Sequence, residues 1–327
     1  MSETRALDRM IAAAPGALRA VAEMDIAAAV DALRGCERIA LVGTGTSFHA
    51  AELGAWALNA EDGRRARAAE SSRLGALDRA EGVILITHTG ETAYSLRVRR
   101  RVLAARQPLV SITGPAVDWP EALVTPVREE AETYTVSYTA ALAVLGRLVD
   151  ALAGAGEPGP RLLGRIADRV ERIVADPEID HVGMPARSLA LVGTGPWAVT
   201  AREAALKLRE GARMLCEGFD AERLLHGFAV PYGPADGLVL VEPDEDPIGL
   251  TAALGAAAAR ESIPVFEITE PTPDTGVVFG QIPITVRLQC LAARFARLRG
   301  TDPDTAITGA WAEPALWELG APGAAEA

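Results

Sequence analysis

The sequence predicts an α/β protein made of two tandem units, each a parallel sheet with helices on both faces in a three-layer, Rossmann or flavodoxin-like arrangement. The main observation is an internal repeat, because the residues ALVGTG occur at 40–45 and again at 190–195. Each copy follows an apolar run and precedes an alanine-rich stretch with helical periodicity. A strand, a glycine turn and a helix in this order open a βαβ unit.

The correspondence between the two copies continues downstream in the same order. Residues 82–92 and 237–247 each read as a second buried strand with its exit loop, and 107–115 and 262–270 read as a third. Residues 133–152 and 283–300 each read as a short strand that runs into a helix. Self-similarity over most of the chain therefore indicates two units of one fold in tandem.

The repeat also defines the domain boundaries. A Gly/Pro-rich stretch at 153–160 separates the two units, and a charged helix over 161–174 leads into the second. The expected segments are an N-terminal helical segment 1–30, a first unit 31–155, a linker helix 156–180, a second unit 181–310 and a C-terminal tail 311–327.

The composition excludes several classes of protein. A net charge of -12 opposes binding to nucleic acid, whose phosphates need a basic face. No apolar run reaches the roughly 18 residues of a membrane span, and the N-terminus has no apolar core of signal-peptide type. Cys36, Cys216 and Cys290 have neither disulfide-framework nor zinc-site spacing. We therefore expect a cytoplasmic protein with no bound metal.

A phosphate site is predicted in the first unit. Ligands of an open parallel sheet bind beyond the carboxyl ends of its strands, where the first unit has THTGET at 87–92. Its hydroxyls, glycine and following helix N-terminus suit a phosphate dianion, and the turn GTGTS at 43–47 should close the site. The second unit has EPDEDP at 242–247 in the same place, and four carboxylates would repel a phosphate. Ordinary Ser/Thr helix caps remain the alternative for both loops.

The glycine turns also allow a dinucleotide-binding interpretation. Gly193, Gly195 and Ala198 satisfy the GxGxxG/A fingerprint, but the first copy has Phe48 in the last position. Glu70 could serve as the acid that binds a ribose, although it belongs to the copy with the broken fingerprint.

A predicted helix over 203–219 carries the candidate acid–base residues. Glu203, Lys207 and Glu210 fall at i, i+4 and i+7, so they share one face of that helix. Lys207 is the only lysine among 32 basic residues, which favours a role that arginine would not fill. His226 follows in AERLLHGF. The structural alternatives are a salt-bridged surface face for the three helix residues and a core position for the histidine. If these groups instead lie near a bound phosphosugar, they could move protons at its C1 and C2 atoms.

These motifs together resemble the sugar isomerase (SIS) family, specifically its double-SIS members. Those members include the isomerase half of glucosamine-6-phosphate synthase and stand-alone amino-sugar-phosphate deaminase/isomerases. THTGET resembles the family's S-x-S-G-E-T phosphate loop, and GTS at 45–47 resembles its C-G-T-S turn. EAALKLRE at 203–210 is similar to E-G-A-L-K-L-K-E, and His226-Gly227 resembles the end of E-L-K-H-G-P. The similarity covers nearly the whole chain.

The resemblance implies a role for each matched residue. Glu210 would shuttle a proton between C1 and C2, Lys207 would stabilise negative charge, and His226 would assist ring opening in a partner's site. A homodimer with shared sites follows, and no cofactor is needed. The residues that would hold the phosphate are Thr46, Ser47, Thr87, His88, Thr89 and Thr92.

Departures from the family pattern narrow the expected reaction. His88 replaces a glutamine-like residue, while Arg223 and Leu225 replace the glutamate and lysine of E-L-K-H-G-P. Residues 134–137 lack the lysine of the family's S-T-K stretch, no lysine follows Lys207, and no glutaminase domain precedes the repeat. We therefore expect a phosphosugar isomerase or an amino-sugar-phosphate deaminase/isomerase rather than a glutamine-dependent aminotransferase. A non-catalytic phosphosugar-binding protein of regulatory type is the alternative.

Overall fold

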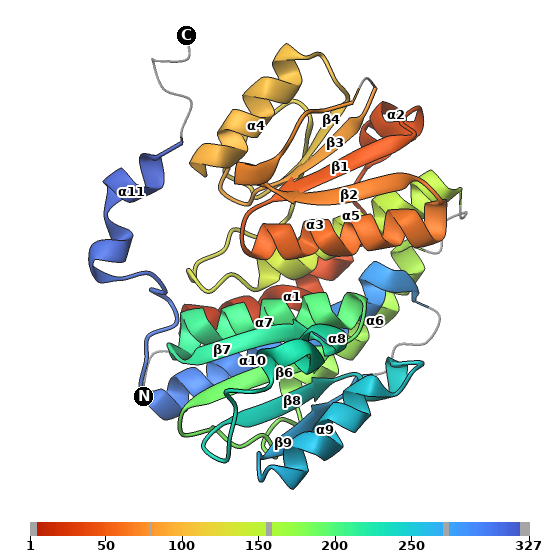
Figure 1. Ribbon diagram of the computed structural model, residues 1–327. Helices are drawn as coiled ribbons and strands as arrows, with labels where there is room; N and C mark the ends of the chain where they lie inside the picture. Colours follow the sequence, from red (N-terminus) through yellow and green to blue (C-terminus); the bar gives the residue numbers. More distant parts are fainter. Residues whose placement is uncertain (1–4, 79, 155–158, 271–274, 321–327) are drawn as a thin grey trace.

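The computed structural model describes residues 5–78, 80–154, 159–270 and 275–320. These residues form two parallel sheets that face each other across a layer of helices (Figure 1). Residues 155–158 of the predicted linker and 321–327 of the predicted tail lie outside the described residues. The expected α/β class with two parallel sheets is confirmed.

The first sheet has the strand order β2-β1-β3-β4-β5, and all its strands are parallel. Its strands are β1 (Arg38–Gly43), β2 (Arg65–Glu70), β3 (Gly82–Ile86), β4 (Leu109–Thr113) and β5 (Ala122–Val124). Alternate residues of β1 enter different cores, with Ile39 and Leu41 on the inner face and Ala40 and Val42 on the outer face. The apolar run of the sequence is thus a strand covered on both sides.

Helices cover both faces of this sheet. On the inner face lie α2 (Ala27–Arg34), α3 (Thr46–Ala57) and α5 (Val136–Ala153), and on the outer face lies α4 (Ala93–Ala104). The helix α3 continues into a short π-helix, η1 (Leu58–Asp62), and a 3₁₀ turn, η2 (Ser71–Arg73), follows β2.

The second sheet has the strand order β7-β6-β8-β9, again all parallel. Its strands are β6 (Ser188–Gly193), β7 (Leu215–Asp220), β8 (Gly237–Val241) and β9 (Val265–Ile268). Its inner face packs on α7 (Pro196–Ala212) and α10 (Gly276–Arg299), and its outer face packs on α9 (Leu250–Arg260). Short turns, α8 (Ala221–Arg223), η3 (Leu224–Phe228) and η4 (Pro243–Glu245), follow β7 and β8.

The central layer joins the two sheets. The helices α1 (Ala6–Ala22) and α6 (Gly159–Ala175) pack on each other and on α5 and α10. The contact between α3 and α7 is the one that matters for the site, because these helices begin at the two repeated glycine turns. Figure 1 shows the two helices side by side between the sheets.

Three expectations about secondary structure are wrong. No strand forms at the start of 133–152 or 283–300, because α5 begins at Val136 and α10 already begins at Gly276. The helix expected over 203–219 ends at Ala212, where Arg213 adopts a left-handed conformation, and 215–220 is the strand β7. Short apolar runs fit a strand and a buried helix equally well by periodicity, which explains these errors.

The two helices α5 and α10 are long and apolar enough to span a membrane, contrary to the expectation that no such stretch exists. However, 78% of the apolar window of α5 and 83% of that of α10 are buried inside the protein. Both helices lie in the core of the central layer, which accounts for their apolar sequences.

The predicted C-terminal tail contains regular structure. Residues after α10 run back to the first unit and form η5 (Gly309–Ala312) and α11 (Pro314–Glu318) (Figure 1). The side chain of Asp304 on this segment accepts hydrogen bonds from the backbone N–H groups of Ala6 and Leu7, at 2.7 and 2.8 Å.

Candidate functional site

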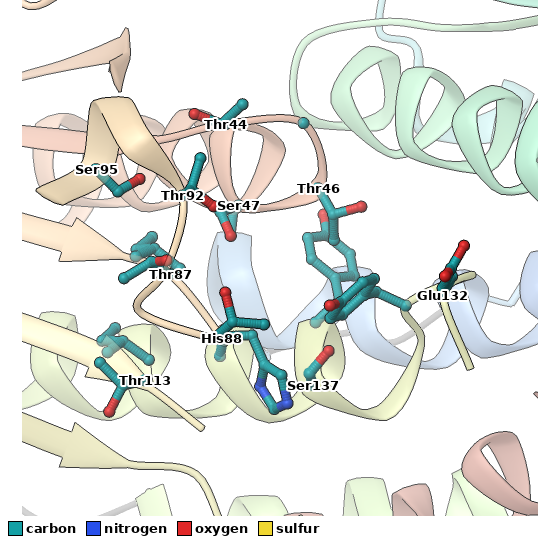
Figure 2. A pocket seen from close by; sticks show the side chains of 18 of the residues that line it. Thr44, Thr46, Ser47, Thr87, His88, Thr92, Ser95, Thr113, Glu132 and Ser137 are labelled. Atoms are coloured by element: carbon teal, nitrogen blue, oxygen red, sulfur yellow. The ribbon is translucent and has the colours of Figure 1, made fainter. Parts of the chain in front are cut away.

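A cavity of about 500 Å³ opens at the carboxyl edge of the first sheet, where the loops after β1 and β3 meet (Figure 2). Its lining includes every residue predicted to hold phosphate, together with the predicted base: Thr46, Ser47, Thr87, His88, Thr89, Thr92 and Glu210. The structure therefore brings the two predicted halves of the site into one cavity. The first half comes from the first unit and Glu210 comes from α7 of the second.

One end of the cavity is a cluster of hydroxyls. Figure 2 shows the side chains of Ser47, Thr87 and Thr92 gathered near one another at the strand ends. Thr92 occupies the N-cap position of α4, and Gly45 does so for α3 with a φ of 57°. Two helix N-termini with hydroxyl side chains thus converge on the cavity, an arrangement suited to an anion.

The shape of the loop after β3 depends on Gly90 and Thr89. Gly90 has a φ of 68°, and a Cβ there would come within 2.9 Å of Val117. The hydroxyl of Thr89 accepts a hydrogen bond from the N–H of Glu91 at 3.2 Å, which leaves its own proton free to donate. The loop is therefore a tight turn, and Thr89 lines the cavity.

Two buried hydroxyls of the cavity wall have no hydrogen-bond partner within the described part of the chain. They are the Oγ1 atom of Thr113 and the Oη atom of Tyr138. A buried polar atom without a partner is costly, so such atoms commonly meet a ligand or an ordered water. Both atoms are consistent with a polar occupant of the cavity.

His88 connects two segments beside the cavity. Its Nε2 accepts a hydrogen bond from the N–H of Glu129 at 3.1 Å, and its ring meets Tyr134 edge-on. Burial, with a smaller contribution from the positive charge of Arg128, lowers the pKa of His88 to about 4. A Cβ at Gly114 would come within 2.5 Å of this ring, which explains the glycine. The ring is therefore neutral at pH 7 and can offer a phosphate at most one N–H.

Thr46 lines the cavity, but its hydroxyl serves another partner. It donates to Oε1 of Glu203 at 3.2 Å, and Nδ1 of His49 lies 2.6 Å from Oε2 of the same carboxylate. Only 1% of the Glu203 side chain and 13% of the His49 side chain are exposed. The sequence interpretation gave His49 no role, although its position three residues after Thr46 places it near the same helix face.

Lys207 lies directly behind the predicted base. Its Nζ is 2.6 Å from Oε2 of Glu210 and 3.6 Å from Oε1 of Glu203. Burial acts to lower the pKa of Lys207, but the carboxylates of Glu210 and Glu203 outweigh it and raise that pKa. Burial raises the pKa of Glu210, and the ammonium of Lys207 opposes this rise. Glu210 is therefore a partly buried carboxyl with a buried cation as its partner, a combination typical of functional sites.

Glu129 is a further charged group that the sequence interpretation missed. Its Oε2 accepts from the N–H and the hydroxyl of Ser137, at 3.0 and 2.7 Å, and from the N–H of Thr135 at 3.0 Å. It therefore caps the start of α5 beside the cavity. A carboxylate that binds the start of a helix from eight residues upstream has no local sequence signature, because capping motifs are read over about three residues.

His226 lies outside the cavity. It belongs to η3, 73% of its side chain is exposed, and its Nε2 is 3.9 Å from Oε1 of Glu222. The alternative of a core histidine is therefore wrong. Leu225 and Phe228 beside it are also exposed, and the guanidinium of Arg223 stacks on the Phe228 ring at 4.6 Å. Within one chain, this histidine is separate from the cavity that contains Glu210.

The corresponding place in the second unit is filled by the protein's own carboxylates. Asp246 accepts from the N–H groups of Ile248 and Thr251, at 3.0 and 2.7 Å, and so occupies the N-terminus of α9. Glu242 accepts from the N–H of Glu270. These backbone donors are the kind that a phosphate would use, so the prediction that this unit has no phosphate site gains a physical reason beyond repulsion.

The C-terminal segment completes the cavity wall, which the sequence interpretation did not foresee. Ile307, Ala312 and Trp317 line it, and the carboxylate of Glu132 accepts a hydrogen bond from the N–H of Ile307 at 3.0 Å. The indole N–H of Trp317 donates to the carbonyl of Trp311 at 2.8 Å. The second glycine turn, which carries the dinucleotide fingerprint, does not line this cavity.

Comparisons with known proteins agree with this architecture. Residues 32–150 match the SIS domain. The chain is 26% identical over 308 residues to glutamine–fructose-6-phosphate aminotransferase [isomerizing] of Thermococcus kodakarensis, a match that covers 82% of this chain and 50% of that protein. The chain thus spans about half the length of this curated relative.

Two solved structures share the fold over almost the whole chain. Glucosamine-6-phosphate deaminase from Thermotoga maritima superposes with a TM-score of 0.71 at 20% identity, covering 91% of this chain and 96% of that one. Tagatose-6-phosphate ketose/aldose isomerase from Escherichia coli superposes with a TM-score of 0.74 at 18% identity, covering 93% and 95%. The matched residues 32–150 contain the first sheet, and the chain as a whole shares the fold of these two solved structures.

Proposed function

We propose, from the premise that residues 32–150 are a SIS domain, that the chain is an enzyme acting on a phosphorylated sugar or amino sugar. The reaction is aldose–ketose isomerisation, or isomerisation coupled to loss of the amino group, and the second sheet is a second SIS-type unit. The observation that carries the proposal is the position of Glu210. This carboxyl lies in the same cavity as the hydroxyl cluster and is held by a buried ammonium 2.6 Å away.

Phosphate recognition is assigned to neutral donors. Among the described residues that line the cavity, neither lysine nor arginine occurs. Hydroxyls of Ser47, Thr87, Thr89 and Thr92, with the N-termini of α3 and α4, would hold the phosphate instead. Neutral donors suit a chain with a net charge of -12, because they select a small anion without attracting polyanions.

Proton transfer is assigned to Glu210. In the ionised form it would take the proton from C2 of the open-chain aldose and return it to C1, so that an enediol intermediate becomes the ketose. The ammonium of Lys207 would offset the negative charge that moves between Glu210 and the substrate. For a 2-amino sugar, the enolamine formed in the same way would become an imine, which water hydrolyses to the ketose and ammonia.

Ring opening is assigned to His226 of a second copy of the chain. The side chain is exposed and lies outside its own chain's cavity, beside exposed Leu225 and Phe228. In a homodimer with shared sites, each His226 would reach the other chain's cavity, where it would move the proton between O1 and O5.

The test is solvent exchange across a panel of hexose and hexosamine 6-phosphates. We expect the C2 hydrogen of one aldose phosphate, or a C1 hydrogen of its ketose, to exchange with D₂O, as measured by proton NMR. Ammonia release, measured in parallel, separates the deaminase from the isomerase. A phosphosugar that binds tightly without any exchange would support the regulatory binding protein instead. Binding can be detected as added stability, about 2.7 kcal/mol at a hundred times the dissociation constant.

A further inference from the structure

A continuous line of polar contacts crosses the boundary between the two units behind the proposed base. It starts at His49 on α3, passes through Glu203 and Lys207 on α7 and ends at Glu210. The distances along it are 2.6 Å from His49 Nδ1 to Glu203, 3.6 Å from Glu203 to Lys207, and 2.6 Å from Lys207 to Glu210. His49 and Glu203 are 154 positions apart in the sequence and meet only because α3 packs on α7.

The ammonium of Lys207 lies near two carboxylates, but it is closer to one than to the other. Glu203 and Glu210 flank it on one helix, and both could form a contact ion pair with its ammonium. The contact is close only for Glu210. At Glu203, Nδ1 of His49 lies 2.6 Å from Oε2, and the Thr46 hydroxyl donates a hydrogen bond to Oε1 at 3.2 Å. A carboxylate whose two oxygens already accept hydrogen bonds is stabilised less by a close contact with the ammonium.

The other carboxylates around this line have their own partners, and the remaining titratable groups are phenols. On α3 and α7, Glu52 pairs with Arg202 at 2.7 Å. Before and within α5, Glu129 is bound by backbone and hydroxyl donors, and Tyr134 and Tyr138 are phenols whose pKa burial raises. None of these groups replaces His49 on the Glu203 carboxylate in the described residues.

We propose that His49 is a positioning residue, which binds Glu203 so that Lys207 stays paired with Glu210 and Glu210 stays available as the base. This inference rests on the proposed function for its catalytic meaning, but its physical content concerns only the ionisation of Glu210. Without the hydrogen bond from His49, a buried carboxylate with 1% exposure would lack one partner and would draw on Lys207. Glu210 would then lose part of its ion pair and hold its proton to a higher pH.

The experiment measures the ionisation of Glu210 in the ligand-free protein. The carboxyl carbons of glutamate are labelled with ¹³C, the Glu210 signal is assigned by its loss in Glu210→Gln, and its titration midpoint is followed by NMR. In His49→Leu, which removes the donor, we expect the midpoint to rise by about one pH unit. In His49→Asn, whose side-chain N–H₂ occupies the place of Nδ1, the midpoint should stay near that of the wild type.

A double variant tests whether the effect of His49 reaches Glu210 through Glu203. In His49→Leu with Glu203→Gln, the competing charge is gone, so the midpoint should return to the wild-type value or below it. Where His49→Leu fails to fold, Glu203→Gln alone should lower the midpoint in a chain that retains His49. The matched control is His181→Leu, because His181 is an exposed histidine whose Nε2 lies 2.9 Å from the carbonyl oxygen of Glu267.

Two results would overturn the proposal. An unchanged Glu210 midpoint in folded His49→Leu would show that His49 does not act on the base. An equal rise in the single and double variants would show that Glu203 is not the link. Where the enzyme turns over, the acidic limb of the pH–rate profile should move with the midpoint. A wild type without exchange on any phosphosugar would remove the proposed function, while the NMR titration would still decide the role of His49.

Discussion

The hydroxyl of Thr46 donates a hydrogen bond to Oε1 of Glu203 at 3.2 Å. This contact connects the residue after the glycine turn of the first unit to helix α7 of the second. The hydroxyl cluster and the proposed base come from different units, so the cavity is complete only when α3 packs on α7. The two copies of the repeat therefore contribute different groups to one cavity, because the first supplies the hydroxyl cluster and the second supplies Glu210.

Replacing Glu210 with glutamine should remove the proposed base while keeping the size of the side chain. We expect turnover to fall by about two to four powers of ten, the usual range for general acid–base catalysis. Affinity for the phosphosugar should change little, because under the proposed function the hydroxyl cluster would supply most of the binding. Loss of C2 hydrogen exchange in D₂O, followed by proton NMR, checks the prediction.

The matched control for this variant is Glu267→Gln, because Glu267 is exposed on the far sheet. Glu203 shares the site face of α7 and could be chosen as a neighbouring control, but it is buried and bound to His49 and Thr46. Wild-type exchange rates in Glu210→Gln would assign the proton shuttle to another group.

The hydroxyl cluster should contribute selectively to phosphosugar binding. Hydrogen bonds to a charged group are worth about 1.5–3 kcal/mol each, so Ser47→Ala combined with Thr92→Ala should weaken binding by at least a hundredfold. Binding of the unphosphorylated sugar should be nearly unaffected, and calorimetric titration of both ligands makes the comparison. Thr269→Ala, at an exposed threonine of the second unit, is the control. Equal losses for the two ligands would move the phosphate to another part of the cavity.

The neutral imidazole of His88 should make the protein less stable in acid. Burial lowers the pKa of His88 from 6.5 to about 4, so between these values the unfolded chain binds more protons than the folded one. The stabilisation is complete above pH 6.5 and is lost as the pH falls toward 4. Between pH 7.5 and 5, the wild type should lose about 2 kcal/mol more unfolding free energy than His88→Gln.

Urea unfolding of both proteins at the two pH values measures this difference. Other groups that titrate in the same range are common to both chains, so their contributions cancel. A pH dependence that is the same for His88→Gln and the wild type would show that the imidazole is not held neutral.

Glu242 should give the opposite pH dependence of stability to His88, because it should destabilise the fold as the pH rises. Burial raises the pKa of its carboxyl to about 7, against the hydrogen bond from the N–H of Glu270. A raised carboxyl pKa stabilises the fold at low pH, and this contribution is lost as the pH rises from 4.5 toward 7 and above. Glu242→Gln keeps an acceptor for the N–H of Glu270. Its free energy of unfolding should therefore rise by about 2 kcal/mol relative to that of the wild type between pH 5 and 8. Thermal or urea unfolding checks this against Glu261→Gln, an exposed control, and no relative gain would contradict it.

The repeated strands and glycine turns could be predicted from the sequence because their signals are local. β1, β3 and β4 are buried on both faces and read as continuous apolar runs, as do β6 and β8. The edge strands β2 and β7 were missed because they are partly exposed and contain charged residues, such as Arg65 and Glu217. Their place in the sheet depends on pairing with β1 and β6 and not on their own pattern.

The candidate site was only partly predictable for the same reason. Motif residues such as Thr92 and Glu210 are recognisable within a few positions of sequence. His49 and Glu129 are not, because their partners are brought to them by the packing of α3 on α7 and by the fold of the segment before α5. Trp317 belongs to a tail that sequence patterns leave undefined, yet it lines the cavity.

The proposed sharing of sites between two chains leads to the last prediction. If Glu210 of one chain works with His226 of its partner, Glu210→Gln and His226→Asn dimers should each be nearly inactive. A hybrid dimer of the two would contain one site with both changes and one site with neither. Random exchange makes about half of the dimers hybrids, each with one of two sites intact, so activity should recover to about a quarter of the wild-type value. Co-expression with two different affinity tags would isolate the hybrid itself, which should show about half of the wild-type rate per dimer. A parallel mixture of Glu267→Gln with His226→Asn controls for the effect of mixing, and a hybrid no more active than its parents would place both residues in one chain's site.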